Sequence, residues 1–88
     1  MTERFFLYDD TVSAPMRFVS FMGEHQRYDL GIIQTDRYYG KSIVLDIQGN
    51  RFAIIGQDDL QEEGYIEHTF HLNKEEAEEL TSFLMEIV

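Results

Sequence analysis

Hydrophobic and polar residues alternate over most of the first two thirds of the chain, with the period of two that is typical of β-strands. One such run follows Pro15, which fits the start of a strand because proline has no backbone N–H to donate. Gly31 lies inside another run and predicts a bulge or a close backbone approach. Gly49 and Asn50 separate two apolar runs and predict a two-residue hairpin turn of type II′, whose first position has a positive φ. The pattern predicts six strands, over residues of about 3–9, 15–22, 28–36, 42–48, 51–57 and 65–72.

The hydrophobic period changes at the C-terminal end of the chain. Asn73 is followed three residues later by Glu76, which is a capping-box variant of a helix start. Acidic residues in the first turn suit the positive end of the helix dipole. We therefore expect an amphipathic helix over residues 74–87, with its apolar stripe formed by Ala77, Leu80, Phe83, Leu84 and Ile87.

These elements predict an α+β fold, in which an antiparallel β-meander of about six strands is followed by one helix in a single domain over residues 1–88. A helix of this length is about 21 Å long and 10–12 Å wide. It cannot cover one face of a six-stranded sheet, which is roughly 25–30 Å wide. Either the sheet curls into a roll or partial barrel that the helix plugs, or a second chain covers it, most simply an identical one. The two alternatives are compatible with each other.

The net charge of −10 is unevenly distributed along the chain. Residues 1–51 carry a net charge of −1, and residues 52–88 carry −9, with Lys74 as their only basic group. An acidic excess repels phosphate at long range, so we expect neither nucleic acid nor an anionic membrane as a partner. The absence of cysteine and of a long apolar segment near the start favours a cytoplasmic protein.

The densest cluster of ionisable side chains lies in residues 57–68, QDDLQEEGYIEH. Its acids come as adjacent pairs, which does not match the alternating ligands of the best-known calcium loop. His68 and His71 are three apart on a predicted strand, so they point to opposite faces and do not converge on zinc. A polar surface loop between strands explains the segment more simply, and we assign no metal ligand, cofactor or catalytic residue.

No nucleophile, nucleotide-binding or metalloenzyme motif occurs in the chain, so we expect a non-enzymatic protein-interaction module. The expected partner is a second copy, another protein, or both, bound through the sheet face that the helix leaves bare or through a free strand edge. The alternative is a protein that binds a small ligand or a divalent cation through the acidic segment, residues 58–67. Candidate rim residues of the interaction surface are Arg37, Tyr38, Tyr39, Asp58, Asp59, Glu62 and Glu63.

The stretches RFFLYDDT, RFVSFMGE, QTDRYYGK, GNRFAIIGQDDLQEEGYIEH and EEAEEL together span nearly the full length of the chain. Through them the sequence resembles the domain-of-unknown-function 3055 family of small, uncharacterised proteins from bacilli and their relatives. The resemblance implies a soluble intracellular protein. It implies no activity, and it assigns no functional residue to this chain.

Overall fold

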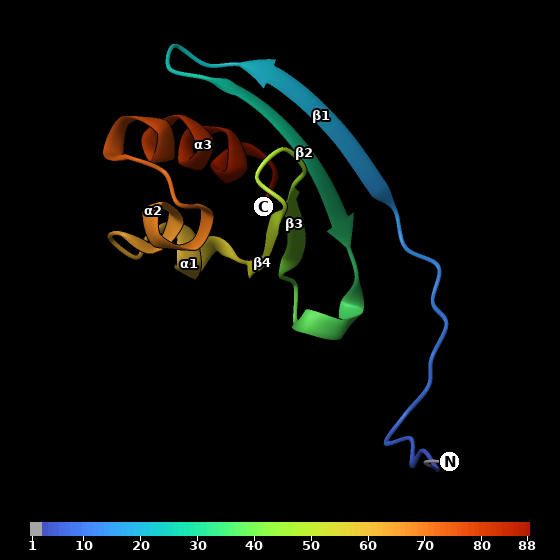
Figure 1. The fold of residues 1–88 in the computed structure, drawn as a ribbon. Coiled ribbons are helices and arrows are strands. Elements are labelled where there is room, and N and C mark those ends of the chain that lie inside the picture. Colours follow the sequence, from blue (N-terminus) through green and yellow to red (C-terminus); the bar gives the residue numbers. More distant parts are fainter. Residues whose placement is uncertain (1–2) are drawn as a thin grey trace.

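A computed structural model describes residues 3–88, which form a four-stranded antiparallel sheet with the three α-helices on one side (Figure 1). The strands lie in the order β1-β2-β3-β4. This confirms the α+β class and the antiparallel meander, but the sheet has four strands instead of six and is not closed. The strands are β1 (Met16–Met22), β2 (Arg27–Gln34), β3 (Ser42–Asp46) and β4 (Arg51–Ile55), and the helices are η1 (Asp36–Tyr38), α1 (Gln57–Leu60), α2 (Tyr65–Phe70) and α3 (Lys74–Ile87).

The strand register determines which side chains share a face. Phe21 lies opposite Tyr28, and Ile32 lies opposite Val44, so alternate residues of neighbouring strands line the inner face under the helices. The apolar stripe of α3 packs against this face, where Phe83 contacts the ring of Phe21 with the ring centroids 4.8 Å apart. The core comprises Tyr28, Leu30, Val44, Ala53, Ile55, Leu60, Ile66, Phe70, Ala77, Leu80 and Leu84, all of them buried.

Helix α3 matches the sequence prediction at both ends. The Asn73 side chain accepts a hydrogen bond from the Glu76 amide, and the Glu76 carboxylate accepts one from the Asn73 amide. This reciprocal pair satisfies two of the amide donors that a helix start leaves free.

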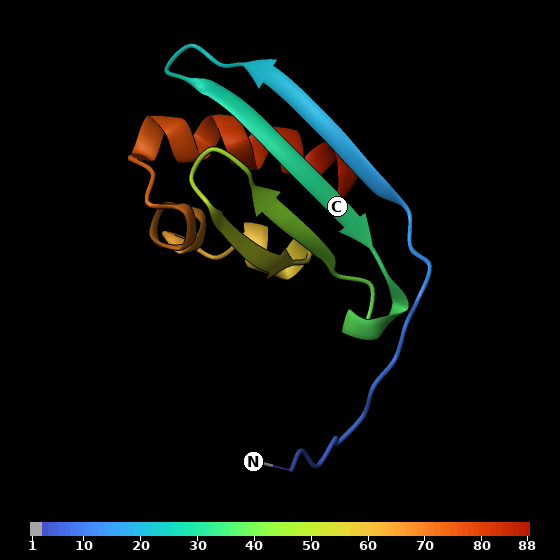
Figure 2. The same ribbon diagram turned by 45° about the vertical axis from the view of Figure 1, so that its right-hand side comes forward.

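The strand predicted over residues 3–9 is wrong. Residues 3–15 form no strand or helix, although the run Phe5–Tyr8 has high β-propensity. A strand needs a neighbour, and within the described residues this run has none. Residues 3–14, which we call the N-terminal arm, run beyond the end of the sheet and away from the three α-helices (Figure 2). The arm contributes to a radius of gyration of 15.1 Å, where a compact domain of this length has about 12 Å.

The strand predicted over residues 65–72 is also wrong, because residues 65–70 form helix α2. Ile66 and Phe70 fit both periods, since they are two steps apart along a strand face and one turn apart on a helix. Both side chains are buried beneath α3. The helix ends at His71 in the left-handed conformation, and the Leu72 amide bonds the Glu67 carbonyl in a Schellman arrangement.

The hairpin of β3 and β4 is confirmed, but its turn differs from the prediction. Asp46 pairs with Arg51, so residues 47–50 form a four-residue connection, and the positive φ falls on Asn50 instead of Gly49. The Asp46 carboxylate accepts a hydrogen bond from the Gly49 amide and stabilises this longer turn. Gly31 lies in regular pairing without a bulge, and the close approach there comes from the side chains of Met16 and Leu45.

Candidate functional site

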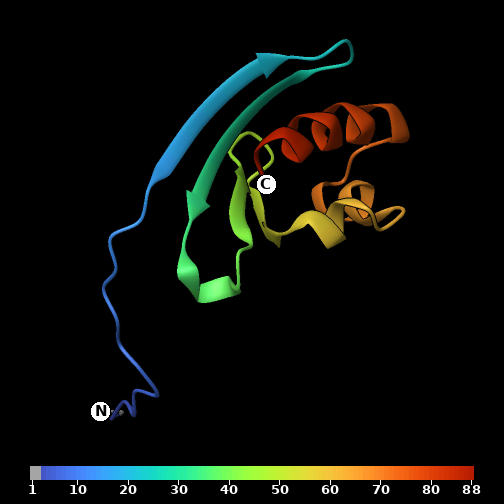
Figure 3. The ribbon, with the colours of Figure 1, turned by 180° about the vertical axis from the view of Figure 1, so that it is seen from behind.

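The sheet face that points away from the helices, here called the outer face, is apolar and uncovered. All three α-helices lie on the opposite side of the sheet (Figures 1 and 3). Phe18 on β1 is 71% exposed, and Phe52 on β4 is 65% exposed. A monomeric protein rarely exposes so many large apolar side chains on one surface. By strand register, the apolar side chains of the outer face are Met16, Phe18, Met22, Ile33, Ile43, Leu45, Phe52 and Ile54.

The outer face carries few charges, and those it has pair with each other. Near the β1–β2 connection, Arg27 Nη2 lies 3.1 Å from Asp29 Oδ1, and Arg27 Nε donates to Ser20 Oγ over 3.2 Å. All ten acids of residues 52–88 belong to α1, α2, α3 and their connections, on the other side of the sheet. The outer face is therefore an apolar, nearly neutral surface on a strongly acidic protein.

The predicted rim residues Arg37, Tyr38 and Tyr39 lie in and after η1, between β2 and β3. The Arg37 guanidinium forms an ion pair with Asp10 at 3.3 Å and lies over the ring of Tyr8, 5.1 Å from its centroid. Arg37 thus holds the N-terminal arm at Tyr8 and Asp10. Tyr38 is half-buried, whereas the side chain of Tyr39, which has a positive φ, is 99% exposed.

The acidic segment does not form one site. Asp58 and Asp59 face Lys41, whose ammonium group lies 3.6 Å and 3.0 Å from their respective carboxylates. Desolvation would raise the pKa of Asp59, but hydrogen bonds from the Gly56 amide and from Lys41 outweigh it and lower that pKa. The hydrogen bond to Asp59 in turn raises the pKa of Lys41. This cluster fixes the start of α1, which begins at Gln57, in place of the loop expected from the sequence.

Glu62 and Glu63 lie apart from that cluster, in the exposed turn between α1 and α2. His68 is exposed on α2, and His71 follows the end of that helix, so neither belongs to a strand as expected. Within residues 3–88, no group of three or more His, Asp or Glu side chains is placed to hold a metal ion. No helix in this part of the chain is long and apolar enough to cross a membrane.

A polar contact that joins the β1–β2 connection to α3 was not predicted from the sequence. The buried Tyr28 hydroxyl donates to Glu79 Oε1 over 2.8 Å and lies 2.9 Å from the Glu76 carbonyl oxygen. The Glu79 carboxylate also accepts hydrogen bonds from the amides of Glu24 and His25. Burial and the bond to Glu79 raise the pKa of Tyr28, so its hydroxyl stays protonated. Desolvation would raise the pKa of Glu79, but the bonds from Tyr28, Glu24 and His25 outweigh it and lower that pKa.

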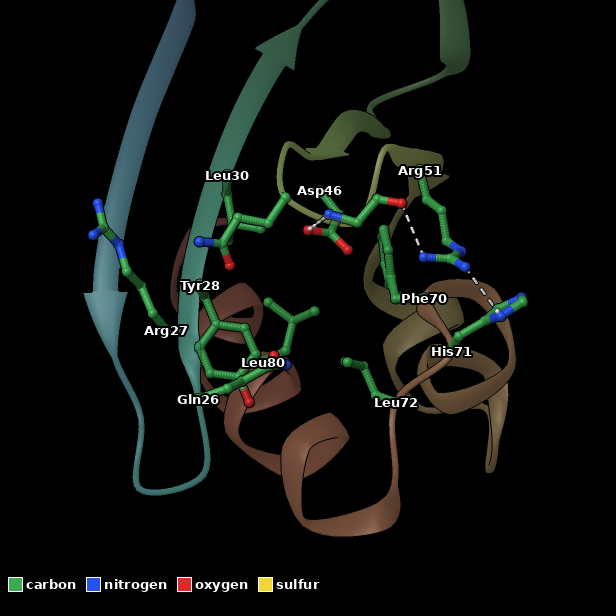
Figure 4. A pocket seen from close by; sticks show the side chains of 12 residues that line it. Gln26, Arg27, Tyr28, Leu30, Asp46, Arg51, Phe70, His71, Leu72 and Leu80 are labelled. Carbon is green, nitrogen blue, oxygen red and sulfur yellow. Dashed lines mark hydrogen bonds between the residues drawn. The ribbon is translucent and has the colours of Figure 1, made fainter.

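A cavity of about 270 Å³ opens beside this contact, between the ends of the two hairpins and helices α2 and α3 (Figure 4). Its base is apolar, and its rim is polar. Arg51 donates to the Gly49 carbonyl over 2.9 Å and lies 3.2 Å from His71 Nδ1. Because arginine only donates, His71 accepts at Nδ1 and carries its ring proton on Nε2. The base comprises Tyr28, Leu30, Phe70, Leu72 and Leu80.

A comparison of the sequence with models of protein families gives a match that covers nearly all of the folded part of the chain. Residues 7–86, which include every strand and nearly all of α3, match a family model described as SAV0927-like. A search of curated proteins returns no match. The match supports the expectation of a small uncharacterised family, while the domain-of-unknown-function 3055 name stays a prediction.

Proposed function

The chain belongs to the SAV0927-like family, and from its geometry we propose that it is a non-enzymatic protein-interaction module that works as a homodimer in the cytoplasm. The single observation that carries this proposal is the uncovered apolar outer face. Three helices cover one face of the sheet, and nothing among the described residues packs as a layer on the other. A second copy supplies such a layer by sheet-on-sheet packing, in which the two sheets lie about 10 Å apart.

The exposed area of the chain supports this assignment. Its accessible surface is 6690 Å², whereas a compact monomer of 10.4 kDa exposes about 5400 Å². The excess of about 1300 Å², to which both the outer face and the exposed N-terminal arm contribute, is larger than the roughly 800 Å² that each partner contributes to a standard interface. An interface of standard size therefore fits within the surplus surface of the chain.

The charge distribution favours a second copy over a nucleic acid or another strongly charged partner. Two outer faces meet without bringing like charges together, because Arg27 and Asp29 already neutralise each other. The acids of the helical layer stay on the far side of each sheet, beyond the Debye length of about 8 Å at physiological salt. The net charge of −10 therefore does not oppose this dimer strongly.

A charged substitution at an exposed position of the outer face tests the proposal. Phe52→Arg places a guanidinium where the second sheet packs, and we expect the variant to elute as a monomer in size-exclusion chromatography. Met85→Arg is the matched control, because Met85 is also an exposed apolar side chain, 51% accessible, but lies on α3. If both variants elute at the same volume as the wild-type protein, the outer face is not the interface.

A second candidate function is the binding of a small molecule, and the cavity beside Arg51 favours it. An apolar base with a few convergent polar groups is the usual construction of a ligand site, although the volume of this cavity is slightly below the usual range of about 300–1,000 Å³. No comparable observation favours a divalent cation at residues 58–67, since Lys41 occupies the space between Asp58 and Asp59. A thermal-shift screen of small polar metabolites tests this candidate, and Arg51→Ala should abolish any stabilisation that arises in the cavity.

A further inference from the structure

The N-terminal arm and the outer edge of β1 are two unpaired strand-forming elements of the same chain. We propose that the arm of one protomer pairs, as an added antiparallel strand, with β1 of a second copy, so that the dimer exchanges its arms. This inference rests on the proposed homodimer and specifies how its two chains are joined.

The arm has the composition of a strand that is covered on both faces. Its residues Phe5–Tyr8 form an uninterrupted apolar run, a pattern typical of strands buried on both sides. Within one chain, these side chains lie in water, with Phe5 91% and Leu7 88% exposed. The backbone of residues 3–14 makes no hydrogen bond to another backbone group in the part of the chain that the structure describes. The arm therefore lacks both the layer and the neighbouring strand that its sequence fits.

The edge of β1 offers what the arm lacks. Within residues 3–88 this strand, Met16–Met22, pairs with β2 on one side only, and the backbone groups that point to its other edge pair with no strand. Proteins usually protect such edges with charges, prolines or covering loops, because a free edge is a template for another strand. Pro15 protects only the start of this edge, and Arg17 is its only charged residue.

The position of the arm favours a second copy over the arm's own β1. Arg37 binds Tyr8 and Asp10 beyond the end of the sheet, and residues 3–7 point away from the chain's own strands in all three views (Figures 1–3). To reach its own β1, the arm would have to leave Arg37 and reverse direction within residues 9–14. A partner's β1 requires no such reversal.

One antiparallel register matches the side chains of the two segments. If Asp9 lies opposite Arg17 of the second copy, the carboxylate meets the one cation of the edge. In the same register apolar or aromatic side chains meet on both faces, Phe6 lies opposite Ser20, and Asp10, which pairs with Arg37, lies opposite Met16. A shift by one residue instead places Asp9 opposite Met16 or Phe18. The resulting apolar pairs are Phe5 with Phe21, Leu7 with Val19, and Tyr8 with Phe18.

Because the chain contains no cysteine, a single engineered pair tests this register directly. Full-length Leu7→Cys and full-length Val19→Cys carry tags of different size and are mixed, refolded together and oxidised mildly. Directly opposite residues of antiparallel strands have Cα atoms about 4.5–5.5 Å apart, within the range that a disulfide spans. We expect a covalent heterodimer on a non-reducing gel. We expect its loss when Met85→Cys replaces Val19→Cys, because Met85 lies on α3.

Three results would overturn the inference, and they differ in whether they also refute the proposed homodimer. If no heterodimer forms while the wild-type protein has the mass of a dimer, arm exchange is refuted and the proposed homodimer is not. If a Leu7→Cys/Val19→Cys double variant closes its disulfide within one chain, the arm pairs with its own β1. A wild-type protein that is monomeric refutes both the exchange and the proposed function.

Discussion

The contact between Tyr28 and Glu79 gives the sharpest prediction about stability. Tyr28→Phe removes one hydroxyl that is buried between β2 and α3 and lies within hydrogen-bonding distance of the Glu79 carboxylate and the Glu76 carbonyl. A hydrogen bond to a charged group stabilises a protein by about 1.5–3 kcal/mol. We therefore expect a loss of about 2 kcal/mol in the free energy of unfolding, which lowers the Tm of a domain of this size by about 10 °C.

The assay is thermal and urea unfolding followed by circular dichroism, at one fixed protein concentration because association shifts the apparent stability. Tyr38→Phe is the matched control. Tyr38 is half-buried in η1, away from the contact between Tyr28 and Glu79, so the same change should stay within about 0.5 kcal/mol of wild type. Equal stability of the two variants would refute the contact as a structural link.

The same contact predicts a dependence on pH, with the sign set by Glu79. The pKa of Glu79 is lower in the folded chain than its ordinary value of 4.5, so the ionised carboxylate favours folding. This contribution is complete above pH 5 or so and is lost as the pH falls through the lowered folded pKa. The stability difference between wild type and Tyr28→Phe should therefore shrink below about pH 4. A difference that stays constant, or grows, under acid conditions would contradict the assignment of Glu79 as the charged acceptor.

Three further substitutions test other parts of the fold. Asn73→Ala removes the cap of α3 and should lower stability by about 1 kcal/mol in urea unfolding, whereas an unchanged midpoint would contradict the capping role. Leu84→Ala opens a cavity under the sheet and should lower stability by about 3 kcal/mol, and a loss below about 1 kcal/mol would show that the site collapses or is not in the core. The lowered pKa of Asp59 means that its ion pair with Lys41 stabilises the folded chain above about pH 4 and is lost in acid. The Asp59→Asn variant should therefore have a lower Tm than the wild-type protein at pH 7 and the same Tm near pH 2. A Tm difference between wild type and Asp59→Asn that is independent of pH would contradict this ion pair.

The sequence predicted those parts of the fold whose local signals agree with one another. Helix α3 has a capping box, an apolar stripe and good helix formers, so every local preference points to the same structure. Helix α2 was missed because Ile66 and Phe70 satisfy two periods, and packing beneath α3 decides between them. The arm was predicted as a strand because its residues favour one, yet strand formation depends on a neighbour that propensity does not supply.

The candidate site was only partly predictable, for related reasons. Comparing the area of one helix with that of six strands predicted uncovered apolar surface, but its premises were wrong, because the sheet has four strands and three α-helices cover one of its faces. The cavity beside Arg51 and the bond between Tyr28 and Glu79 were not predicted, because each joins residues far apart in the sequence. A tyrosine in a predicted strand is a signal that could have revealed the latter, since a buried hydroxyl needs a partner.

Sedimentation equilibrium of the wild-type protein at several concentrations tests the central claim most directly. We predict a mass of twice 10.4 kDa at concentrations of about 10 μM and above, with dissociation only on dilution. A mass of 10.4 kDa at all concentrations up to about 1 mM would contradict the dimer, because an interface of standard size binds more tightly than that.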